Sequence, residues 1–161
     1  MELSRLKWPI IIVVVVGIGW LLTSPGVDYM HRKFTQDPGD DAQKAKAYDA
    51  GLSRLGGYLM MTFQFGKAET VLHDALLLYG PNGQFGVGEN HYFNYYRLAT
   101  VKEHLNKIRE SVDILGDLMD VNARQYDVRV PEIDVLNLRR NKLIEMHELG
   151  EMRGPRPGTR Y

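Results

Sequence analysis

Residues 48–79 read YDAGLSRLGGYLMMTFQFGKAETVLHDALLLY, and this stretch decides the fold. In its first half, large apolar side chains recur at three- and four-residue spacing, as in a helix with one buried face: Tyr48, Leu52, Leu55, Leu59 and Phe63. Gly66 interrupts the pattern. A second apolar stripe follows, made by Ala68, Val71, Leu72, Ala75, Leu76 and Tyr79. The stretch therefore predicts two helices joined by a tight turn.

Three glycines lie inside the first of these helices: Gly51, Gly56 and Gly57. Each costs up to about 1 kcal/mol in a helix interior relative to alanine. On a buried face, a glycine allows another part of the chain to approach closely. We therefore expect the glycines to mark close helix packing.

The order of small and large residues in this hairpin resembles a tetratricopeptide (TPR) repeat. In that family, the small residues let the two helices pack closely and the large ones fill the space between them. The resemblance implies that Gly56 and Ala68 form the close-contact pair. The residues that carry it, with Phe65 and a late Pro81, are Leu52, Leu55, Gly56, Leu59, Ala68, Leu72 and Ala75.

A second, more divergent copy follows at the same relative offsets, with Tyr95, Leu98, Ala99, Ser111, Leu115 and Leu118. It departs from the family at Lys102, where an aromatic residue is usual, and no proline ends the unit. The excess length lies in the glycine-rich stretch 80–89, which we interpret as a loop between repeats. A last helix is predicted after Pro131, and we expect it to close the array with a polar outer face.

The boundaries of this helical domain follow from composition. Asp37-Pro38-Gly39 is a turn, and Asp40 is the predicted N-cap of the first domain helix. We therefore expect a linker over 27–40 and the TPR-like domain over 41–152. Residues 153–161 form a basic tail rich in Pro and Gly, which is either solvated or docks on a partner or on anionic lipid.

Residues 8–22 form an uninterrupted apolar run within the N-terminal segment 1–26. The run predicts a retained single-pass membrane anchor, with Trp8 and Trp20 at the two membrane interfaces. Arg5 and Lys7 precede it and favour an inside N-terminus, with the bulk of the chain periplasmic. The alternative is a cleaved signal peptide, although a good cleavage site is missing. The predicted fold is all-α, with one transmembrane helix followed by a small TPR-like domain.

Composition and motifs exclude several function classes. The chain has 20 basic and 20 acidic residues, so nothing favours broad electrostatic binding of nucleic acid. No catalytic signature or histidine pair occurs. We expect no enzymatic activity, no cofactor and no metal. The carboxylates of Asp113, Asp117 and Asp120 are interpreted as a solvated charged face.

The run from His91 to Tyr96 is the most aromatic stretch of the domain. A helix spreads consecutive residues around its axis, so they cannot all face one core. We expect exposed rings that bind a partner, helped by the tail: Tyr92, Phe93, Tyr95 and Tyr96, with Arg153, Arg156 and Arg160. The alternative is that the long first helix of the domain and the glycine-rich loop cover these rings.

These features together predict a membrane-anchored scaffold or accessory subunit. Its partners would be the lipid bilayer and other protein subunits of a membrane complex, which it would stabilise or help to assemble. The alternative is a periplasmic chaperone-like module that binds client segments transiently.

Overall fold

The computed structural model describes residues 3–21 and 23–152. These residues form helices and contain no β-strand, which confirms the all-α prediction. The helices are α1 (Leu3–Leu21), α2 (Ser24–Phe34), α3 (Ala42–Met61), α4 (Phe65–Leu78), α5 (His91–His104), α6 (Ile108–Asp120) and α7 (Ile133–Met146). Two short 3₁₀ turns, η1 (Ala123–Gln125) and η2 (Gly150–Met152), follow α6 and α7.

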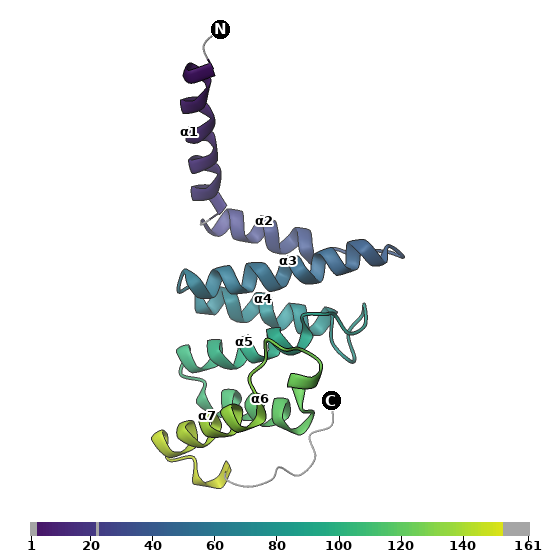
Figure 1. Ribbon diagram of the computed structural model, residues 1–161, viewed down its shortest axis with the longest axis vertical. Coiled ribbons are helices and arrows are strands. Elements are labelled where there is room, and N and C mark those ends of the chain that lie inside the picture. The colour runs from purple at the N-terminus through teal and green to yellow at the C-terminus, as the bar shows by residue number, and fades with distance from the viewer. Residues whose placement is uncertain (1–2, 22, 153–161) are drawn as a thin grey trace.

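The helices from α2 to α7 form a stack in which each helix packs on the next one in the chain (Figure 1). Helix α1 projects away from the stack and packs on α2. The core runs through the stack and has its largest fully buried side chains at Leu52, Leu59, Leu72, Leu115, Leu118 and Leu136. Each interior helix of the stack is therefore covered on two opposite sides, by the helix before it and the helix after it in the chain.

The glycines of α3 receive side chains from three different helices. A Cβ atom on Gly51 would lie 2.5 Å from the ring of Phe34 in α2, and one on Gly56 would lie 2.6 Å from Cδ2 of Leu72 in α4. A Cβ atom on Gly57 would lie 2.9 Å from Nη2 of an arginine in α5, Arg97. The side chain nearest to Gly56 is thus that of Leu72, and the pairing of Gly56 with Ala68 stays a prediction.

The structure differs from the sequence prediction over residues 27–40, where a linker was expected. Helix α2 occupies most of this range, and Val27 is buried. The ring of Phe34 packs on Gly51 and lies 6.0 Å from the ring of Tyr48. The composition concealed a helix because charged residues separate the few apolar side chains that face α3. Helix α3 is capped by Asp41 instead of Asp40, since the Asp41 carboxylate accepts hydrogen bonds from two backbone N–H groups at 3.0 Å.

The predicted membrane anchor is wrong. Among the described residues, no helix is long and apolar enough to cross a membrane. Helix α1 ends at Leu21 and contains Arg5 and Lys7, so its uninterrupted apolar part is shorter than the roughly 20 residues that a bilayer requires. The single-pass localisation with an inside N-terminus and a periplasmic domain falls with it, as do the interfacial roles of Trp8 and Trp20.

Two further expectations differ at helix ends and at the end of the stack. Phe63 lies beyond the end of α3 in a left-handed conformation and is exposed, so it does not extend the apolar stripe. Helix α7 presents a mixed outer face, because Val135, Leu138 and Met146 are exposed on it together with polar residues such as Asp134, Asn137, Lys142 and Glu145. The described stack therefore ends on a surface that is only partly apolar.

Candidate functional site

The aromatic residues of α5 are half-buried, and each has a partner within the chain. The ring of Tyr92 stacks on that of Tyr126, with 5.0 Å between centroids. The guanidinium groups of Arg97 and Arg129 lie 4.1 and 4.5 Å from the centroid of the Phe93 ring. These are cation–π distances, and they fix the ring between two positive charges.

The two remaining rings connect α5 to α6 and α7. The Tyr95 hydroxyl donates a hydrogen bond to Oδ2 of Asp117 at 2.6 Å. The Tyr96 hydroxyl accepts one from Nη1 of Arg139 at 2.9 Å. Asp117 is buried and does not belong to a solvated face.

The rings predicted as exposed are therefore half-buried, and the groups that they contact come largely from α6, α7 and the segment between them. The physical reason is that α5 lies inside the stack, with α4 and α6 packed against it. A role for Tyr92, Phe93, Tyr95 and Tyr96 in partner binding stays a prediction. The predicted tail residues Arg153, Arg156 and Arg160 lie outside the described residues.

A buried carboxylate that the sequence interpretation missed lies on α3. Asp49 is 1% exposed. Its Oδ2 atom accepts hydrogen bonds from the backbone N–H of Asn90 at 3.2 Å and from the Asn90 side-chain amide at 2.7 Å. Its Oδ1 atom accepts none from any described group. Burial raises the pKa of Asp49, while the Asn90 hydrogen bonds oppose that rise.

Tyr79 lies beside this carboxylate at the end of α4. Its side chain is 2% exposed, and its hydroxyl has no hydrogen-bond partner among the described residues. Burial, together with the nearby Asp49 charge, raises the pKa of Tyr79 to about 12. The hydroxyl is therefore neutral at neutral pH and has one proton to donate and lone pairs to accept.

The loop between α4 and α5 forms the wall over these two groups. It folds back on the end of α4, because the Phe85 N–H donates to the Leu78 carbonyl at 2.9 Å and the Gly88 N–H donates to the Tyr79 carbonyl at 3.1 Å. A Cβ atom on Gly88 would lie 2.7 Å from Cγ of Asp49. Only a glycine lets this loop pass so close to the carboxylate.

Loop and helix together enclose an open pocket of about 490 Å³. Four carboxylate residues line it, namely Asp40, Asp41, Asp49 and Glu89, whereas Lys46 is its one basic lining residue. Nζ of Lys46 lies 2.6 Å from Oε1 of Glu89, so part of the negative charge is already paired. The rest of the wall is formed largely by glycine and apolar residues, including Pro38, Ala42, Ala45, Phe85 and Val87.

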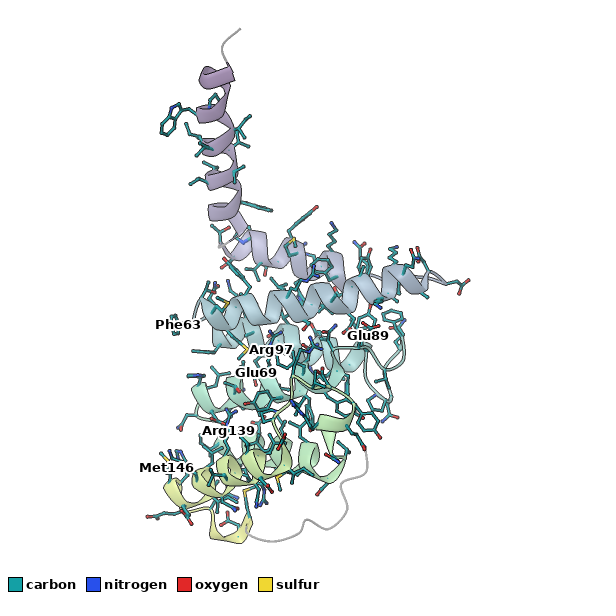
Figure 2. The ribbon with its side chains drawn as sticks, viewed as in Figure 1. Phe63, Glu69, Glu89, Arg97, Arg139 and Met146 are labelled. Carbon is teal, nitrogen blue, oxygen red and sulfur yellow. The ribbon has the colours of Figure 1, made fainter. Side chains whose placement is uncertain are left out.

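A chain of polar contacts positions the base of the pocket. Arg129 forms an ion pair with Asp127 at 2.7 Å, and its Nη1 donates to Oδ1 of Asn90 at 3.0 Å. Asn90 in turn donates both of its hydrogen bonds to Asp49. Figure 2 labels Glu89 on the side of the stack where the α4–α5 loop lies.

A second ionic cluster joins three helices away from the pocket. Lys102 of α5 is buried, and its ammonium group contacts Glu69 of α4 at 2.5 Å and also Glu110 of α6. Lys107 reaches the same Glu69 carboxylate at 2.6 Å. The hydrogen bond from Lys102 is the main cause of a lowered pKa at Glu69. Lys102 thus forms an ionic link between α4, α5 and α6.

Two apolar surfaces have no cover in the described structure. Side chains all around α1 are exposed, with Trp8 at 70% and Val13 at 70%. At the other end of the stack, α7 exposes Leu138 at 72% and Val135 at 55%. Surfaces of this kind mark interaction sites in soluble domains.

The sequence analysis identified the packing positions of the first hairpin but missed the pocket at Asp49 and Tyr79. All seven repeat-packing residues are buried: Leu52, Leu55, Gly56, Leu59, Ala68, Leu72 and Ala75. The signal for Asp49 was present, because it precedes Leu52 by one helical turn and therefore shares the buried face. No signal identified Tyr79 as its neighbour.

No known protein family, curated protein or solved structure matches the chain.

Proposed function

We propose that this chain is a scaffold or accessory subunit that stabilises or helps to assemble a larger protein complex. The proposal assigns it no catalytic activity. The observation that carries it is α1, an apolar helix that projects from the stack with exposed side chains around it.

Exposing the apolar side chains of helix α1 to water is energetically unfavourable. A helix that is apolar on every side normally packs inside a larger protein body. Its exposed residues run without interruption from Trp8 to Gly17. Burying apolar surface contributes about 25 cal/mol per Å², so several such side chains suffice to hold a partner helix or a hydrophobic cleft of another subunit.

The stack itself supports an interaction role through TPR-like repeats. In the first hairpin, Gly56 and Leu72 approach closely and the other packing positions are buried. The matching positions of the second hairpin are buried too: Leu98, Ala99, Ser111, Leu115 and Leu118. We therefore propose that α3–α4 and α5–α6 are two TPR-like units. Because α7 exposes Val135, Leu138 and Met146 at the end of the described stack, we propose that a further helix from a partner extends it.

The test is native mass spectrometry of the tagged full chain, purified from its own host under gentle conditions. We expect a complex of fixed stoichiometry. Adding charge to α1 with Ile12→Lys and Val16→Lys should release the partner. The matched control is the pair Met61→Lys and Leu77→Lys, which adds the same two positive charges at exposed apolar side chains outside α1. A chain that purifies alone, or with many proteins at low occupancy, would contradict the proposal and favour transient client binding.

A further inference from the structure

The pocket beside α3 contains a carboxylate oxygen that lacks a donor. Oδ1 of Asp49 is buried and accepts no hydrogen bond from a described group. Leaving a buried polar atom unsatisfied costs about 1–3 kcal/mol, and more when it is charged. The Tyr79 hydroxyl in the same pocket is also without a partner among the described residues. Both residues line one open pocket, and their buried, unsatisfied oxygens indicate a site that a ligand completes by entering at that wall.

We propose that this pocket binds a guanidinium or ammonium group carried on an alkyl stem. The charge of the pocket lining favours a cation. The lining has one basic residue, Lys46, and four acidic residues: Asp40, Asp41, Asp49 and Glu89. Of these acids, Asp41 is committed to capping α3 and Glu89 to Lys46. Asp49 is the buried acid that keeps an oxygen for the ligand.

The donor geometry fits such a head group. A guanidinium presents several N–H donors in one plane, so one can reach Oδ1 of Asp49 while another reaches the Tyr79 hydroxyl. An ammonium group offers three donors and meets the same two acceptors. Charge-assisted hydrogen bonds of this kind are roughly twice as strong as neutral ones.

The walls fit the stem. Ala42, Ala45, Phe85 and Val87 line the pocket and supply apolar surface for methylene groups. The ring of Phe85 lies 5.4 Å from that of Tyr79, so two aromatic faces stand near the head group. The described residues contain no group of three or more His, Cys, Asp or Glu side chains that could hold a metal ion, and the apolar walls suit the alkyl stem of an organic cation.

This site is independent of the proposed assembly role, which rests on α1. The cation can come from an arginine or lysine side chain of a partner protein or from a free small amine. Both sources present the same chemistry to Asp49. Binding can be measured on the purified chain, so failure of one proposal leaves the other standing.

The experiment is isothermal titration calorimetry of the full chain with three probes. Agmatine tests a free amine, and acetyl-Gly-Arg-Gly-amide tests a peptide side chain. The same peptide with citrulline in place of arginine keeps the shape and removes the charge. We expect saturable binding of at least one cationic probe and at least tenfold weaker binding of the citrulline peptide. Tighter binding of the peptide than of agmatine assigns the ligand to a partner protein, and the reverse assigns it to a free amine.

Variants locate the binding site. Asp49→Asn keeps the side-chain shape and should weaken the cationic probe at least tenfold, and Tyr79→Phe should weaken it severalfold. The control is Asp120→Asn, which makes the same charge change at an exposed residue of α6 and should leave affinity unchanged. Circular dichroism confirms folding of each variant. Equal binding of arginine and citrulline peptides, no saturable heat up to about 10 mM of any probe, or unchanged affinity in folded Asp49→Asn would each overturn the proposal.

Discussion

Gly56 of α3 and Leu72 of α4 approach so closely that a Cβ atom at position 56 would lie 2.6 Å from Cδ2 of Leu72 and 2.9 Å from its Cγ. Leu72 is fully buried, so a side chain added at residue 56 would have to displace it within the core. The distance between the two helices of the first hairpin is therefore set by the absence of a side chain at residue 56.

This relationship predicts the effect of enlarging Gly56. Gly56→Ala should lower the free energy of unfolding by about 1–3 kcal/mol, and Gly56→Leu by more, because overpacking moves side chains and backbone. The control is Gly66→Ala, since a Cβ atom there meets nothing within 4 Å. Chemical denaturation of each variant measures the difference. If both glycine variants unfold at the same denaturant concentration, the close contact does not hold the hairpin.

The buried Asp49 predicts a stability gain on removing its charge. Its pKa is raised by burial above the ordinary value of 3.8, so the ionised form destabilises the native state. Asp49→Asn should raise the free energy of unfolding by about 0.5–2 kcal/mol at neutral pH, as is common at functional positions.

The pH dependence gives the sign of this effect. The difference in the free energy of unfolding between wild type and Asp49→Asn should be absent below pH 3.8, where Asp49 is protonated in both the folded and the unfolded state. It should grow as the pH rises through the folded pKa of Asp49. Thermal unfolding over a pH series measures it. A variant that is less stable than wild type at pH 7 would show that the carboxylate serves the fold and not a ligand.

The hydrogen bond between Tyr95 and Asp117 predicts that the α5 rings support the fold. Tyr95→Phe removes the donor at 2.6 Å from a buried carboxylate and should cost about 1–3 kcal/mol. Tyr126→Phe removes a hydroxyl from an exposed ring and should change stability by less than about 0.5 kcal/mol. Urea denaturation compares the two. If both variants are equally stable, the hydrogen bond from Tyr95 does not support the fold.

The ionic cluster at Lys102 predicts loss of stability in acid. The pKa of Glu69 is lowered below its ordinary 4.5, first by the hydrogen bond from Lys102, so acid favours the unfolded state. The contribution is fully present above pH 4.5 and is lost as pH falls through the folded pKa. Glu69→Gln should lower the thermal midpoint at pH 7, and its difference from wild type should disappear once the pH is below the folded pKa of Glu69. A constant difference at all pH values would rule out this carboxylate as the cause.

Much of the fold follows from the sequence because helix packing leaves a local record. The three- and four-residue spacing of Leu52, Leu55 and Leu59 places these side chains on one face of a helix, whatever lies against it. The glycines beside them mark close approach for the same local reason. The second hairpin repeats the pattern at Leu98 and Leu115, and all five of these leucines are buried.

The apolar run at the N-terminus shows where a local pattern misleads. Composition alone made residues 8–22 a membrane anchor, yet the end of α1 at Leu21 and the charges at Arg5 and Lys7 decide how much apolar length is available. Helix α2 escaped detection for a related reason. Its identity as a helix depends on Phe34 fitting the space left by Gly51, and that space belongs to α3.

The sequence by itself determined an all-α chain, the hairpin positions and the burial of the α3 face on which Asp49 lies. Only the tertiary structure brought Asp49 and Tyr79 together beneath the α4–α5 loop, because their proximity depends on how α3 packs against α4 and on how Gly88 lets the loop pass. The same holds for the α5 rings. Whether a ring such as Tyr92 is exposed depends on what stacks above and below its helix, and spacing within one helix carries no record of that.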